Sequence, residues 1–175
     1  MRKHFYIFFA LLISVSIKTS AQSNNYASKV KTLDSTIKTL YAVISGEKGV
    51  ARDWELFNYL FRPEAKLIPT GTNKQGVHMA RYMTPKDYIN TSGKWLIENG
   101  FFEKEVARSV HKFGNIAQVF TTYEAFKSAS DIKPFMTGIN SIQLLYDNER
   151  WWIVNVYWQQ ANAKNPIPNA FKPKN

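Results

Sequence analysis

The sequence of 175 residues contains no cysteine, which excludes disulfide bonds, thiolate metal sites and a cysteine nucleophile. It has only 8 glycines and 7 prolines, while 45% of its residues are hydrophobic and 15% are aromatic. This composition excludes a collagen-like, low-complexity or disordered chain. The length favours a single domain with short additions at its ends.

The longest hydrophobic run lies at the N-terminus, directly after Arg2, Lys3 and His4. The run covers residues 5–17, about 13 residues, which is short of the roughly 20 that a membrane-spanning helix needs. Small residues follow it and end at Ala21. The pattern predicts a signal peptide over 1–21, cleavage near Ala21 and export to the periplasm or medium. The alternative is an uncleaved anchor; after cleavage no membrane span is expected.

Acidic residues are scarce: 13 Asp and Glu stand against 23 Lys and Arg, a formal net charge of +10. Loss of Arg2, Lys3 and Lys18 with the signal peptide leaves a charge of +7. The remaining cations are scattered singly, whereas nucleic-acid-binding proteins usually concentrate them on one face. No nucleic-acid partner is therefore expected.

After a polar leader over 22–27, hydrophobic spacing predicts helices over residues 28–45, 53–61 and 85–98. Asp53 and Thr84 are the expected N-caps of the second and third helices. A short strand is expected at 65–68. Longer strands are expected at 101–113, 116–127, 138–146 and 151–160, and a proline-containing flexible tail at 161–175.

Gly114-Asn115 is a typical two-residue hairpin turn. With strict alternation, that turn puts Arg108 on the face of Tyr123 and puts Glu103 on the opposite face, with Glu124. A three-residue turn would reverse this grouping and place Arg108 on the side of Glu124. In the last hairpin, the turn alone pairs Tyr146 with Trp151. The apolar pattern instead favours a shift of one residue, which brings two sets together: Ile142, Leu144 and Tyr146 with Trp152, Val154, Val156 and Trp158.

Three helices followed by at least four antiparallel strands predict an α+β domain over 28–160. The order of elements, and the segments 100–105, 113–124, 138–144 and 150–158, resemble the NTF2-like superfamily of SnoaL-like and ketosteroid-isomerase-like proteins. The resemblance implies a cystatin-like cone, with the helices packed on a curved sheet around a pocket. It also implies a homodimer through the outer sheet face. It does not identify a reaction.

Glu124 and its neighbour Tyr123 are the first candidates for catalysis, because they lie in an apolar strand and a buried carboxylate is a good general acid or base. Arg108 is a candidate to hold an anion or to pair with Glu124. The alternative for both charged residues is an exposed strand position. Asn140, Ser141 and Gln143, with Tyr157 and Trp158, are candidate ligand-binding residues, since small-molecule pockets combine apolar walls with a few polar groups.

Metal and cofactor sites are not expected. His78 and His111 lack metal-ligand spacing, and no serine-hydrolase or nucleotide-binding motif occurs. The leading hypothesis is an exported domain that binds a small, largely apolar molecule in its cone. The alternatives are a cofactor-independent lyase, isomerase or hydrolase that uses Glu124, and a structural module that dimerises through its sheet.

Overall fold

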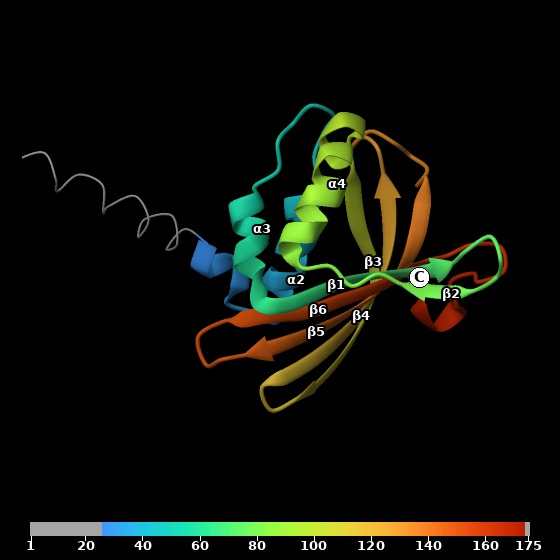
Figure 1. Ribbon diagram of the computed structural model, residues 1–175. Coiled ribbons are helices and arrows are strands. Elements are labelled where there is room, and N and C mark those ends of the chain that lie inside the picture. The colour runs from blue at the N-terminus through green and yellow to red at the C-terminus, as the bar shows by residue number, and fades with distance from the viewer. Residues whose placement is uncertain (1–25, 174–175) are drawn as a thin grey trace, which may run out of the picture.

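The computed structural model describes residues 26–173. In that range three helices pack on one side of a six-stranded sheet, the α+β arrangement that the sequence predicts (Figure 1). The helices are α2 (Leu33–Ile44), α3 (Trp54–Leu60) and α4 (Pro85–Asn99), and residues 26–30 form a helical turn before them. The strands are β1 (Phe61–Thr72), β2 (His78–Ala80), β3 (Phe102–Phe113), β4 (Ile116–Phe126), β5 (Met136–Tyr146) and β6 (Trp151–Gln160). The expected signal peptide lies outside the described residues.

The strands are arranged in the order β2-β1-β6-β5-β4-β3. All neighbours are antiparallel except β1 and β6, which are parallel. The predicted antiparallel pairing of the four long strands is confirmed for β3 to β6. β1 instead pairs parallel to β6, because the chain returns from β1 to β6 through α4 and four further strands rather than through a hairpin. The pairing of β1 with β6 is irregular between Phe61 and Lys66. Pro63 lies in this stretch and has no N–H to donate.

The helix starts follow from local capping. Thr84 accepts a hydrogen bond from the backbone N–H of Asp87, whose carboxylate accepts one from the backbone of Thr84. Asp53 caps α3 by accepting a hydrogen bond from the backbone N–H of Leu56, so both predicted N-caps are confirmed. The first helix, expected as one piece, is interrupted because Thr32 forms its own capping box with Ser35 and starts α2 at Leu33.

A bulge in β3 changes which side chains face the helices. Phe113 pairs with Ile116 and Arg108 with Thr121, as the two-residue turn predicts. Val106 is then an extra residue without a partner on β4, between Glu105 and the next paired position. Beyond it the alternation reverses. The prediction that Glu103 lies on the face of Glu124 is therefore wrong, because Glu103 lies on the opposite, helix-covered face.

The last hairpin combines the two registers that the sequence suggested. Next to the turn Tyr146 pairs with Trp151, and past an extra residue at Val154 the register shifts so that Ile142 pairs with Val156. As a result, Trp151 and not its neighbour Trp152 is fully buried near the turn. The predicted one-residue shift exists, but it begins only after Val154.

The sheet is strongly curved, and the three helices lie within its concave side (Figure 1). The core forms where the apolar faces of the helices meet this inner face, because those faces lose water there. Its fully buried members come from both layers and include Ile37, Phe57, Leu60, Leu96, Val119, Ile142 and Ile153.

A buried arginine joins the ends of two helices. Arg52 is 6% exposed, and its guanidinium donates hydrogen bonds to the backbone carbonyls of Ile44 and Gly46, at 3.0 and 2.6 Å, and of Leu96, at 3.0 Å. These carbonyls lie at the C-terminal end of α2 and in the last turns of α4, where helices leave acceptors unpaired. The single side chain therefore holds the two helix ends together.

We expect Arg52→Met to lower the free energy of unfolding by about 2–4 kcal/mol, because several buried carbonyl groups lose their donor. Urea unfolding followed by tryptophan fluorescence measures the change. The control is Arg62→Met, whose side chain is 41% exposed and should change stability by no more than about 0.5 kcal/mol. Equal losses in the two variants would contradict the role assigned to Arg52.

Candidate functional site

A cavity of about 210 Å³ lies between the helices and the concave face of the sheet. Its walls are mainly aromatic and aliphatic, and its polar groups are few, as in small-molecule sites. The volume is below the roughly 300–1,000 Å³ of pockets for drug-sized ligands, so it suits a smaller molecule. Residues from both layers line it, among them Tyr41, Tyr88, Trp95, Glu103, Tyr123, Asn140 and Trp158.

Glu103 is the carboxylate of this cavity. The bulge at Val106 turns it toward the helices, and its backbone N–H donates to the hydroxyl of Ser45 at 3.0 Å. Burial raises the pKa of Glu103 to about 7, although a hydrogen bond from Asn140 acts in the opposite direction. The side chain therefore changes its charge near neutral pH.

Asn140 connects Glu103 to the helix layer. Its Nδ2 atom donates to Glu103 Oε1 and to the hydroxyl of Tyr41, both at 3.0 Å. The Tyr41 hydroxyl lies 2.5 Å from Thr121 Oγ1. Because α2, β3, β4 and β5 each contribute one member, the network holds its polar groups in defined positions.

Three tyrosines surround the carboxylate. Burial, and then the charge of Glu103, raise the pKa of Tyr41, Tyr88 and Tyr123, so all three stay neutral at physiological pH. Tyr123 fits only because residue 138 is glycine: a Cβ there would lie 2.4 Å from the Tyr123 hydroxyl. The site therefore presents neutral hydroxyls beside one titratable carboxyl group.

The predicted site residues are divided between the two faces of the sheet. Tyr123, Asn140 and Trp158 line the cavity. Neighbouring strand residues point to opposite faces, so Glu124 lies on the outer face and is partly exposed. The other three predicted ligand-binding residues, Ser141, Gln143 and Tyr157, line two hollows outside this cavity.

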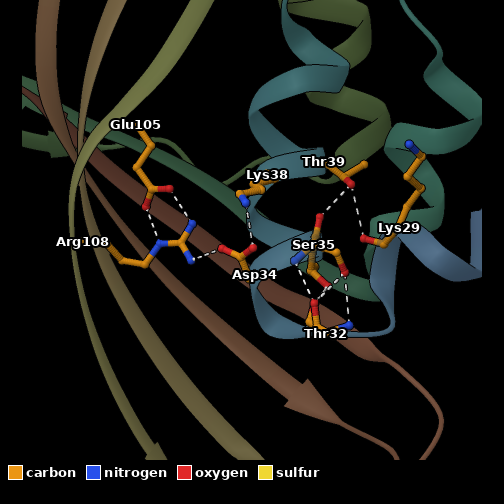
Figure 2. Close-up of polar contacts among 9 residues, drawn as sticks. Lys29, Thr32, Asp34, Ser35, Lys38, Thr39, Glu105 and Arg108 are labelled. Carbon is orange, nitrogen blue, oxygen red and sulfur yellow. Dashed lines mark hydrogen bonds and ion pairs between the residues drawn. The ribbon is translucent and has the colours of Figure 1, made fainter.

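Arg108 lies on the inner side of β3. The pairing with Glu124 that the sequence suggested does not form, because Glu124 lies on the outer face. The Arg108 Nε atom donates to Glu105 Oε1 at 2.6 Å, a second nitrogen donates to the other carboxylate oxygen, and Nη1 lies 3.0 Å from Asp34 Oδ1 (Figure 2). Lys38 also contacts Asp34, at 2.9 Å. The guanidinium thus joins β3 to the start of α2.

The C-terminal segment covers part of the outer face. The short 3-10 turn η1 (Asn169–Phe171) places the Phe171 ring 4.9 Å from that of Phe120, and Thr122 donates to the Phe171 carbonyl at 2.5 Å. Between this segment and the sheet lies a hollow of about 250 Å³, lined in part by Ser141 and Tyr157. The end of the tail is therefore packed through Phe171, its one aromatic side chain, whereas most of residues 161–173 are exposed.

Solved structures match this arrangement of helices and sheet. An NTF2-like protein with a cystatin-like fold from Novosphingobium aromaticivorans superposes with a TM-score of 0.58 and 10% identity, over 90% of this chain and 96% of that one. The chain has the NTF2-like cone fold. A protein of unknown function with a cystatin-like fold from Nostoc punctiforme has a TM-score of 0.56 and 9% identity, over 75% of this chain and 90% of that one.

A third structure, an NTF2-like superfamily protein from Salmonella enterica serovar Typhimurium, has a TM-score of 0.52 and 17% identity, covering 84% of this chain and 95% of that one. No protein-family model matches the chain, and no curated protein matches it by sequence. At such identities the likeness establishes the NTF2-like fold but not an activity.

Sequence reasoning missed Glu103 because no glycine or proline marks the bulge in this NTF2-like cone. One signal was present. With strict alternation from Arg108, the side chain of Lys104 would point into the apolar interior, which is unfavourable for an unpaired ammonium. The bulge instead puts Lys104 outside, with its amine 4.6 Å from the centre of the Phe126 ring.

Within residues 26–173, no helix is long and apolar enough to span a membrane. The same residues bring together no group of three or more His, Asp or Glu side chains that would hold a metal ion.

We expect the difference in unfolding free energy between Glu103→Gln and the wild type to depend on pH. The folded-state pKa of Glu103 is about 7, above the value of about 4.5 in the unfolded chain, so the native state binds the proton more tightly. The native state therefore loses stability as the pH rises from about 4.5 to 7. Glutamine removes this ionisation. The unfolding free energy of the variant relative to the wild type should therefore increase between pH 5 and pH 8, by up to about 3 kcal/mol.

Urea unfolding at both pH values measures this difference. The control is Glu64→Gln, which removes a carboxylate whose side chain is 78% exposed on β1. A pH-independent difference for Glu103→Gln, or an equal change in the control, would show that the cavity does not shift the ionisation of Glu103.

Proposed function

We propose that this chain binds a small, largely apolar molecule in the cavity of its NTF2-like cone, without a cofactor. The observation that carries the proposal is the meeting of Glu103, Asn140 and Tyr41 in an otherwise apolar cavity of about 210 Å³. Apolar walls supply binding energy through lost water contact, and a few polar groups fix the orientation of a ligand. Trp158 and Tyr123, both expected from the sequence to take part in the site, belong to these walls.

Export and a homodimer belong to the same proposal. Export rests on the N-terminal sequence that ends at Ala21. A homodimer through the outer sheet face is supported by three exposed apolar side chains around one hollow of about 510 Å³: Phe113, Ile116 and Val154. The packed tail occupies another part of that face, so a dimer contact would use the end of the β3–β4 hairpin.

Native mass spectrometry of the protein purified from its own host tests for a ligand. A bound mass that disappears on denaturation is expected. Ser92→Phe should abolish that mass, because Ser92 lines the cavity and a phenyl ring there fills the space. Asn90→Phe puts the same ring at an exposed position of α4 and should retain the ligand. A mass that persists in folded Ser92→Phe would locate the ligand elsewhere, and a clean apoprotein would count against binding.

Acid–base catalysis is a second candidate, favoured by one observation. The pKa of Glu103, at about 7, is near the value at which a carboxyl group exchanges protons with a substrate most effectively at neutral pH. The candidate enzyme is a lyase, isomerase or hydrolase without cofactor. In it, Glu103 would be the general acid or base, the role that the sequence suggested for Glu124. The tyrosine hydroxyls would stabilise developing negative charge.

If the chain is such an enzyme, Glu103→Gln should bind the compound found by mass spectrometry but convert it at least about 100-fold more slowly. Glu64→Gln should convert it at the wild-type rate. Loss of turnover in Glu124→Gln, with normal turnover in Glu103→Gln, would reverse the assignment. If the wild type does not convert the compound, the catalytic candidate fails and only the binding proposal remains.

A further inference from the structure

The cavity combines many aromatic rings with a single acidic side chain. Tyr88, Trp95 and Trp158 are among the rings that line it, and they come from α4 and β6. Tyr88 also stacks on Phe57, with ring centres 5.4 Å apart. Aromatic faces carry partial negative charge and attract cations, most strongly where water is excluded.

Among residues 26–173, no basic side chain belongs to the cavity lining, so none of them provides Glu103 with a counter-ion there. The guanidinium of Arg108, which lies on the same side of β3, is committed to Glu105 and Asp34. A charged carboxylate in an apolar space is unfavourable unless an opposite charge or several donors compensate it. In the network described above, Asn140 supplies one donor to Glu103. A ligand with a positive charge would supply what is missing.

We infer that the cavity takes a small organic cation, an amine or quaternary ammonium group with an apolar substituent, held between the Glu103 carboxylate and the aromatic rings. This inference rests on the proposed function and specifies the class of its ligand. A neutral apolar ligand would use the same walls but would leave the carboxylate without an opposite charge.

Charge elsewhere in the molecule opposes this preference only weakly. The chain is basic overall, but distant charges are screened over about 10 Å at 0.1 M salt, whereas the carboxylate and the ligand would be in contact. The titratable groups that face Glu103 are Tyr41 from α2, Tyr88 from α4 and Tyr123 from β4, and all three remain neutral. Glu103 is therefore the group that couples cation binding to pH.

The experiment compares benzyltrimethylammonium with neopentylbenzene, which has the same shape with carbon in place of the charged nitrogen. Binding to the full exported protein is followed by the fluorescence of Trp95 and Trp158, both in the cavity wall. At pH 8 the cation should bind at least about tenfold more tightly than the neutral compound, although water solvates the cation far better. Below pH 6 this preference should decrease, because protonated Glu103 no longer attracts the cation.

Three variants test which residues cause the preference. Glu103→Gln should lose the preference for the cation at pH 8 and bind the neutral compound as before, while Glu64→Gln should behave as the wild type. If Glu103→Gln does not fold, Tyr88→Leu removes one ring and keeps the carboxylate, and it should weaken binding of the cation more than that of the neutral compound.

Each result decides between the claims. Equal or tighter binding of neopentylbenzene at pH 8 would overturn the inference and leave the proposed function intact. A cation preference that survives in both Glu103→Gln and Tyr88→Leu would also overturn it. If neither compound binds to the folded protein, and it carries no ligand in native mass spectra, the proposed function fails as well.

Discussion

The extra residue in β3 is the constraint on which the character of the cavity depends. Without Val106 as a bulge, alternation along the strand would turn Lys104 inward and Glu103 outward. The bulge exchanges them, so a carboxylate enters the apolar interior and an ammonium leaves it. Since burial raises the pKa of that carboxylate to about 7, one displaced residue decides both the charge of the site and the pH range in which it changes.

Other features of the sheet hold Glu103 in a defined place. Asn140 donates to Glu103 and to Tyr41 from the middle of β5, and Tyr41 contacts Thr121 on β4. Gly138 leaves room for the Tyr123 hydroxyl. These contacts connect strands with a helix, so the polar end of the cavity is held by the same packing that holds the core. Arg52 in turn joins the C-terminal ends of α2 and α4.

The two faces of the sheet have different roles. The inner face, covered by helices, carries the buried network and the cavity. The outer face carries Glu124 and Ser141, the packed tail and the exposed apolar end of the β3–β4 hairpin. Phe171 covers part of this face, which confines any contact with a second copy to the part that stays exposed. The proposed ligand site and the proposed dimer interface therefore use different side chains.

Much of the fold could be predicted because its signals are local. The caps at Asp53 and Thr84, the turn at Gly114-Asn115 and the hydrophobic spacing lie within a few residues of the elements they define. The candidate site could be predicted only in part. Tyr123, Asn140 and Trp158 line the cavity, whereas Glu103 was assigned to the wrong face, since strict alternation was carried through a bulge that no glycine or proline announces.

By itself, then, the sequence determined the α+β class, the order of the elements and the resemblance to NTF2-like proteins. The parallel pairing of β1 with β6, the two bulges, the docking of Phe171 and the position of Glu103 rather than Glu124 in the cavity follow from contacts between distant parts of the chain. The reason is physical. Caps and turns are stabilised by neighbours in the chain, but a bulge depends on the packing of distant strands and helices, which decides the face that each side chain takes beyond the extra residue.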